Sequence, residues 1–266
     1  AYLMPGDETV MAAQTFPQYK FSALAENATV VEVPLKDGVH DLQAMGERIT
    51  DRTKIVWLCN PNNPTGTFVT RAELVRFLDA VPSRVMVVLD EAYFEYADDP
   101  EYPDGIALLP RYPNLLVLRT FSKIYGLASL RIGYGVAHAN VIRIVNQVRQ
   151  PFNTSRFAQT AAIAALGDLE FVRRCKEANR QGLKTLGEAF DRMGLKPFPS
   201  QANFIFVDVQ RDAKDVFQRL LQRGIIVRAG FPGFPTGVRI TVGTPEQNEK
   251  LLAALEAVLH EVKVQV

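Results

Sequence analysis

One lysine, Lys123, stands alone in a polar, hydroxyl-rich loop between two apolar segments. Thr120 and Ser122 lie just before it, and Arg131 follows it by eight positions. A lysine amine can form a Schiff base with an aldehyde. Two hydroxyl groups and a guanidinium can together hold a phosphate dianion. These residue types at this spacing predict the chemistry of pyridoxal phosphate, although a solvated loop with a surface arginine would show the same residues.

A second group of candidate residues begins with Asp90, which ends the apolar segment 85–90. A carboxylate at the end of a buried strand must be solvated, paired or coordinating, because burying it alone is costly. A pyridinium nitrogen is a suitable partner, since the carboxylate keeps it protonated and the ring can then accept electrons from a substrate carbon. Asp90 and Glu91 are equally compatible with the capping of a following turn.

Strand-like and helix-like segments alternate up to residue 118, and they would position these side chains. We expect strands at 9–13, 29–33, 54–59, 85–90 and 115–118, and helices at 17–25, 41–48 and 70–80. This alternation is typical of an α/β fold with a mainly parallel sheet that has helices on both faces. Sites in such folds lie at the carboxyl ends of strands. The runs 60–66, 90–93 and 120–131 follow three of these strands, so we expect them to meet in one crevice.

The second half of the chain has a different pattern. We expect helices at 140–148, 155–166, 169–193, 213–223 and 244–262, and strands at 203–207, 225–227 and 238–242. This pattern predicts a small α+β domain. We therefore divide the chain into a large cofactor-binding domain, 1–155, and linking helices with a small C-terminal domain, 156–266.

Two arginines in this half, Arg228 and Arg239, lie at the end of one expected strand and within another. Guanidinium groups on neighbouring strands can converge on one dianion. Surface arginines are common, so either arginine alone fits an ordinary surface charge better than a binding site.

Three segments resemble motifs of the fold type I pyridoxal-phosphate aminotransferases. They are S-K-x-x-G-L-x-x-x-R-x-G-Y at 122–134, D-E-A-Y at 90–93 and N-P-x-N-P-T-G at 60–66. The resemblance implies that Lys123 is the catalytic lysine and that Asp90 binds the ring nitrogen of pyridoxal 5′-phosphate. It also implies further cofactor-binding residues, namely Asn63 and Tyr93 on the phenolic oxygen, Tyr19 stacked on the ring, and Thr120, Ser122 and Arg131 on the phosphate.

The C-terminal half is similar to histidinol-phosphate aminotransferase, through G-I-I-V-R at 224–228, G-V-R-I-T-V-G-T-P-E-Q-N at 237–248 and R-Q-P-F-N at 149–153. This resemblance implies transamination of L-histidinol phosphate with 2-oxoglutarate in histidine biosynthesis, by a homodimer. It also implies that Arg228 and Arg239 hold the substrate phosphate. The alternatives are an aromatic amino acid aminotransferase, a phosphothreonine-type decarboxylase and a truncated, non-catalytic chain.

The composition narrows the class of partner. The net charge is +1 and no basic run exceeds two residues, so we expect neither a nucleic acid nor a membrane partner. Two cysteines far apart in a chain of 266 residues indicate a reducing compartment, and we expect the cytoplasm. The three histidines lack metal-ligand spacing, so we expect no metal. Compared with the family pattern, we expect the chain to lack an N-terminal part.

Overall fold

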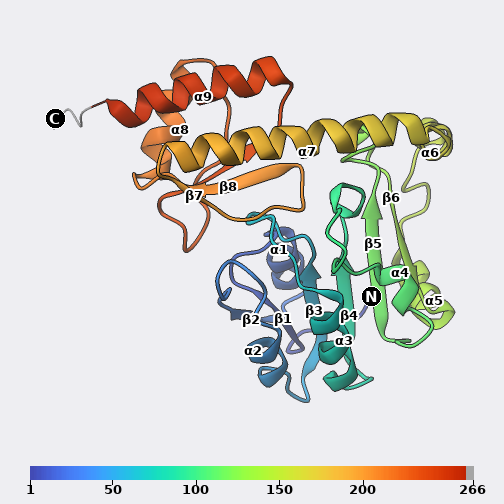
Figure 1. The fold of residues 1–266 in the computed structure, drawn as a ribbon. Coiled ribbons are helices and arrows are strands. Elements are labelled where there is room, and N and C mark those ends of the chain that lie inside the picture. Colours follow the sequence, from blue (N-terminus) through green and yellow to red (C-terminus); the bar gives the residue numbers. More distant parts are fainter. Residues whose placement is uncertain (262–266) are drawn as a thin grey trace.

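The computed structural model describes residues 1–261, which form a large and a small sheet (Figure 1). The large sheet has the strand order β2-β1-β3-β4-β5-β6. Its strands are β1 (Glu8–Ala12), β2 (Thr29–Val33), β3 (Thr53–Cys59), β4 (Met86–Asp90), β5 (Leu115–Thr120) and β6 (Gly133–Ala137). The first five strands pair in parallel, and β6 pairs with β5 in the antiparallel direction. The predicted fold class, with a mainly parallel sheet, is confirmed.

Helices cover both faces of this sheet because its strands are apolar on both sides. One face packs against α2 (Leu42–Glu47), α3 (Arg71–Ala80) and α4 (Gly105–Leu108). The other face packs against α1 (Gln18–Ala25) and α5 (Ala139–Val148). Helix α3 begins at a capping box in which Thr70 and Glu73 bond each other's backbone N–H groups. Short 3₁₀ turns, η1 (Phe94–Tyr96) and η2 (Ala128–Leu130), follow β4 and β5.

The C-terminal part forms the small domain. Its sheet has the order β7-β8-β9, all antiparallel, and packs on α7, α8 and α9 around a core of its own. Its elements are α6 (Arg156–Gly167), α7 (Leu169–Arg192), β7 (Lys196–Pro197), β8 (Phe204–Asp208), α8 (Ala213–Gln222), β9 (Gly237–Thr241) and α9 (Pro245–His260). Figure 1 shows α7 as one long helix that runs from α6 to the small sheet. The domain boundary at residue 155 lies just before α6 and stays a prediction.

The expected strand at 225–227 is wrong. This segment is irregular, and a single bridge joins Arg228 to Arg239 of β9 through their backbone groups, at 3.0 and 2.8 Å. Ile226 is 81% exposed, so the apolar pattern that suggested a strand has no packing partner on one side. Strand β7 was not expected, because two residues carry no periodicity. The last expected helix reaches His260, and Val262 lies outside the described residues.

The core of the large domain gives a test of this architecture. Leu115 is fully buried at the start of β5, whereas Leu24 on α1 is half exposed. We expect Leu115→Ala to lower the free energy of unfolding by about 2–5 kcal/mol, because a cavity remains in a packed core. Leu24→Ala should change it by less than about 1 kcal/mol. Urea unfolding of both variants checks this, and equal losses would contradict the placement of β5.

Candidate active site

A cavity of about 810 Å³ opens where the carboxyl ends of the parallel strands meet the small domain. Asn63 after β3, Asp90 at the end of β4 and Lys123 after β5 all line it. Arg228 and Arg239 line it from the small domain. Strands β3, β4 and β5 are neighbours in the sheet, which is why residues 60 positions apart along the chain meet here.

The carboxylate of Asp90 is held by two donors. The hydroxyl of Tyr19 donates to its Oδ2 at 2.5 Å, and the backbone N–H of Ala92 donates to its Oδ1 at 3.1 Å. Burial raises the pKa of Asp90, and the bond from Tyr19 acts in the opposite direction. The bond from Ala92 caps the turn that follows β4, as expected if Asp90 were only a capping residue. This bond uses one of the two carboxylate oxygens, and the side chain still lines the cavity.

Lys123 reaches the same cavity from the loop after β5. Its Nζ lies 5.1 Å from the centre of the Tyr93 ring. Burial lowers the pKa of Lys123, and the positive charge of Arg239 lowers it further. A larger share of the amine is therefore neutral and nucleophilic near pH 7 than for an exposed lysine.

Arg239 is oriented by contacts that leave its charge unpaired. Its Nη1 donates to Asn63 Oδ1 at 2.5 Å, and its guanidinium lies 4.9 Å from the ring centre of Phe204. Its Nε is buried without a partner, and in residues 1–261 no acidic side chain is within ion-pair distance of it. Burial lowers the pKa of Arg239, and nearby Arg228 adds to this. Two guanidinium groups at one wall favour an anionic ligand.

Thr120, Ser122 and Arg131 form a separate cluster on the lysine loop. Thr120 Oγ1 accepts from the backbone N–H of Ser122 at 3.0 Å. Arg131 adopts the left-handed conformation, with φ of 52°, and its Nη1 lies 3.5 Å from Ser122 Oγ and 2.6 Å from the oxygen of Ala128. The three side chains thus gather beside Lys123, but they do not line the cavity.

Tyr19, which we expected to stack on a cofactor ring, is buried and does not line the cavity. Its ring is stacked on Trp57 at 4.7 Å and its hydroxyl holds Asp90. Phe16 lines the cavity instead and meets Tyr19 edge to face at 5.5 Å. The sequence carried a signal for Phe16, since it lies in the turn between the carboxyl end of β1 and α1, but an aromatic residue in a short turn does not reveal which ring faces the cavity.

A buried ion pair next to Asp90 was also missed by the sequence reasoning. Glu91 is fully buried, and its carboxylate accepts from Arg119 Nε at 2.9 Å and from the backbone N–H of Gly105 at 2.8 Å. Arg119 also pairs with Asp104 at 2.7 Å. This network joins the carboxyl ends of β4 and β5, which carry Asp90 and the lysine loop.

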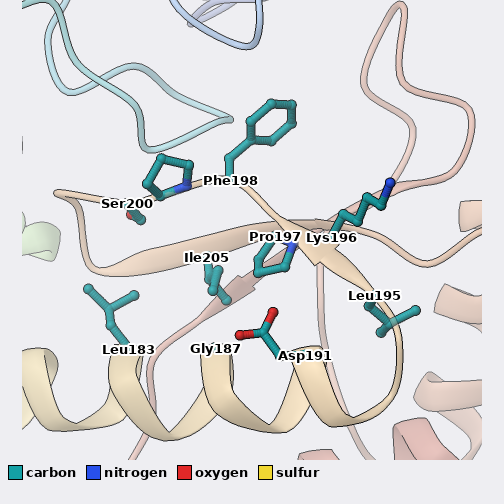
Figure 2. A pocket seen from close by; sticks show the side chains of 10 residues that line it. Leu183, Gly187, Asp191, Leu195, Lys196, Pro197, Phe198, Ser200 and Ile205 are labelled. Carbon is teal, nitrogen blue, oxygen red and sulfur yellow. The ribbon is translucent and has the colours of Figure 1, made fainter.

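A second cavity, of about 500 Å³, lies within the small domain (Figure 2). Leu183 and Asp191 of α7 face Pro197 and Ile205 across it. None of the predicted site residues lines this cavity. The candidate chemistry therefore belongs to the first cavity.

Comparisons with known proteins agree with this site. The model of the family "Aminotransferase class I and II" matches residues 1–255. Histidinol-phosphate aminotransferases from Brevibacillus brevis and Bacillus subtilis are 55% and 54% identical over 260 and 261 residues, 97% of this chain in each case and 71% and 72% of theirs. This chain belongs to the histidinol-phosphate aminotransferase family. The solved family member from Sinorhizobium meliloti, 31% identical, superimposes with a TM-score of 0.91 over 97% of this chain and 71% of that one.

The structure of the Sinorhizobium meliloti family member is a complex with pyridoxal-5′-phosphate. The residues of this chain fit that group. Asp90 is a partly buried acceptor for a protonated ring nitrogen, and Lys123 is an amine with a lowered pKa in the same cavity. The Ser122 and Arg131 cluster next to Lys123 supplies donors for a phosphate. The cavity and the adjoining Ser122 and Arg131 cluster together therefore offer a suitable group for each end of the cofactor.

The charge of Arg239 gives a test of the site's electrostatics. Removing it in Arg239→Gln should raise the pKa of Lys123, because the nearby positive charge of Arg239 is one of the causes that lower it. The rate of reductive methylation of Lys123, followed by mass spectrometry, should then reach half its maximum at a higher pH than in the unaltered chain. Arg228→Gln is the matched control and should shift this pH less. A shift to lower pH in Arg239→Gln would contradict the account.

Proposed function

We propose that this chain transfers the amino group of L-histidinol phosphate to 2-oxoglutarate in histidine biosynthesis, with pyridoxal 5′-phosphate as its cofactor. The observation that carries the proposal is one cavity lined by Lys123, Asp90 and two arginines that have no carboxylate partner within residues 1–261. The names of the similar proteins support the same substrate.

The cofactor, when bound, supplies a cationic ring that accepts the electron pair left on the substrate carbon after loss of its proton. Asp90 holds the ring nitrogen in its protonated form, and Tyr19 helps to keep Asp90 ionised. Asn63 and Tyr93 donate to the phenolic oxygen. Burial raises the pKa of Tyr93, so its hydroxyl keeps its proton. Tyr19 thus remains a cofactor-binding residue in this proposal, through Asp90, while Phe16 supplies the stacking ring.

Lys123 carries out the proton transfer. Its Nζ would hold the cofactor through the aldehyde carbon. When free, this Nζ would be the base that accepts the proton of the substrate carbon. A lysine pKa lowered by burial and by Arg239 suits both roles, because the amine must be neutral to accept a proton.

The remaining charged residues hold the two phosphates. Thr120, Ser122 and Arg131 bind the cofactor phosphate beside Lys123. Arg228 and Arg239 bind the phosphate of the substrate at the small-domain wall, and among residues 1–261 neither arginine pairs with an acidic side chain. The same arginines can bind a carboxylate of 2-oxoglutarate, since both ligands present oxygens to a guanidinium fork.

Donor selectivity tests the proposed function. We expect kcat/KM for histidinol phosphate to exceed that for histidinol and for phenylalanine, measured with 2-oxoglutarate as acceptor. Arg239→Gln should lower the value for histidinol phosphate by roughly 10²-fold, because a charge-assisted contact is worth about 1.5–3 kcal/mol. The value for histidinol, which has no phosphate, should fall much less.

Other outcomes of this assay would contradict the proposal. A preference for aromatic donors would indicate an aromatic amino acid aminotransferase. Release of carbon dioxide from phosphothreonine would indicate the decarboxylase. A chain that binds the cofactor but turns over none of these compounds would be non-catalytic.

We further propose that the chain acts as a homodimer in the cytoplasm, with the domains divided at residues 155 and 156. An exposed apolar surface supports the dimer. Phe152, Phe157, Ile163 and Leu169 are between 73% and 100% exposed, on α6 and beside its ends. Apolar surface of this kind is typical of a protein interface.

The free cysteines support the proposed cytoplasmic location. Cys59 and Cys175 are free thiols, which suits a reducing compartment. In residues 1–261, no helix is long and apolar enough to span a bilayer.

The dimer can be tested on α6. We expect the double variant Phe157→Glu, Ile163→Glu to move the sedimentation coefficient from that of a dimer to that of a monomer, because charges in an apolar contact lose their hydration. Leu221→Glu, on an exposed site of α8, is the control and should leave the dimer intact. A monomeric unaltered chain would contradict the proposal.

A further inference from the structure

Asn62, in the middle of the 60–66 segment, uses every hydrogen-bonding group it has. Its side chain is fully buried, and its Nδ2 donates to the backbone oxygen of Gln14 and to Thr65 Oγ1, both at 3.0 Å. Its Oδ1 accepts from Thr15 Oγ1 at 2.8 Å. Its backbone bonds Gly66 and Thr67, both at 2.7 Å. Because each hydrogen-bonding group of this buried amide has a partner, Asn62 holds in place the segments to which its partners belong.

The partners of Asn62 carry two walls of the cavity. Gln14 and Thr15 lead into Phe16, and all three line the cavity on one side. Asn63, the next residue after Asn62, lines it too, whereas Asn62 does not. In the described part of the chain, both hydrogen bonds between segments 13–17 and 60–66 are made by the side chain of Asn62. This side chain is therefore the polar tie between the two walls.

The partners of Asn62 make further hydrogen bonds away from the cavity. Thr65 Oγ1 bonds Thr67 Oγ1 at 2.8 Å, and Thr67 Oγ1 donates to the oxygen of Gly38 at 2.6 Å. On the other side, Gln14 Oε1 accepts from the backbone N–H of Leu35 at 3.1 Å. Asn62 is thus joined through its partners to a buried network that has no freedom to shift locally without breaking further bonds.

We propose that Asn62 is a positioning residue that sets the distance between Phe16 and Asn63, and through it the affinity of the chain for its cofactor. This role rests on the proposed function, in which Phe16 stacks on the cofactor ring and Asn63 donates to its phenolic oxygen. Asn62 acts through these two residues, since it touches neither the cavity nor Lys123. Its donor group is the essential part, because Nδ2 alone reaches the Gln14 backbone.

Two substitutions separate a donor role from the filling of space. Asn62→Asp keeps the volume and the acceptor for Thr15, but it places a carboxylate oxygen against the Gln14 carbonyl. Asn62→Ala removes both groups. Asn248→Ala is the matched control, because Asn248 is also a buried asparagine with two backbone bonds, to Gly243 in the small domain.

The first measurement is amide hydrogen exchange by mass spectrometry, with and without added pyridoxal phosphate. Without cofactor, peptides covering 13–17 and 60–67 should exchange at least tenfold faster in both Asn62 variants, and not in Asn248→Ala. The second measurement is titration with pyridoxal phosphate. Its dissociation constant should rise at least tenfold in both Asn62 variants and by less than twofold in Asn248→Ala.

The possible outcomes distinguish a failure of the positioning role of Asn62 from a failure of the proposed function. Unchanged exchange in 13–17, or an Asn62→Asp variant that binds pyridoxal phosphate as the unaltered chain does, would overturn the positioning role. If the unaltered chain binds no pyridoxal phosphate, the proposed function fails, while exchange without cofactor still decides whether Asn62 ties the two walls. If the Asn62 variants do not fold, Thr15→Val removes only the hydroxyl that bonds Oδ1, and faster exchange in 13–17 is still expected.

Discussion

A partly buried carboxylate at the end of β4 is the constraint on which the rest of the site depends. Burying Asp90 without a cationic partner is costly, and the bonds from Tyr19 and Ala92 offset only part of that cost, because burial still raises its pKa. A protonated ring nitrogen in the cavity would offset the rest of this cost, because it would place a cation against the carboxylate. The position of Asp90 is fixed in turn by the parallel pairing of β4 with β3 and β5.

Charge is distributed unevenly around this carboxylate. Lys123 lines the cavity from the loop after β5, Arg239 and Arg228 line it from the small domain, and Arg239 has no acidic partner in the described part of the chain. The positive wall favours anionic substrates and lowers the pKa of Lys123 at the same time. Binding of the substrate anion and activation of the lysine therefore have one electrostatic cause, which lies in the small domain. The Asn63 to Arg239 bond joins that domain to the end of β3.

Much of this could be predicted from the sequence, because the decisive residues lie at strand ends and the strands are strongly apolar. The convergence of Asn63, Asp90 and Lys123 follows from parallel strands that are neighbours in the sheet. The prediction of a strand at 225–227 was wrong because three apolar residues in a row do not reveal whether a partner strand lies beside them. The positions of Tyr19 and Phe16 could not be separated either, since both are aromatic and only the helix that begins at Gln18 turns one of them inward.

The contacts of Asn62 lay beyond the sequence for another reason. Gln14 and Thr15 precede it by almost fifty positions, and no periodicity links a turn asparagine to a backbone carbonyl at that separation. The same holds for the bond between Arg239 and Asn63, which spans both domains. Such contacts depend on how the chain packs in three dimensions, whereas a sequence motif shows only which residue types are present.

The most direct test of the account is to locate the lysine that holds the cofactor. The chain is mixed with pyridoxal phosphate, treated with borohydride to convert the lysine linkage to a stable amine, digested and sequenced by mass spectrometry. The account predicts a phosphopyridoxyl group on Lys123, at close to one group per chain. Labelling spread over other lysines, or none on Lys123, would contradict it.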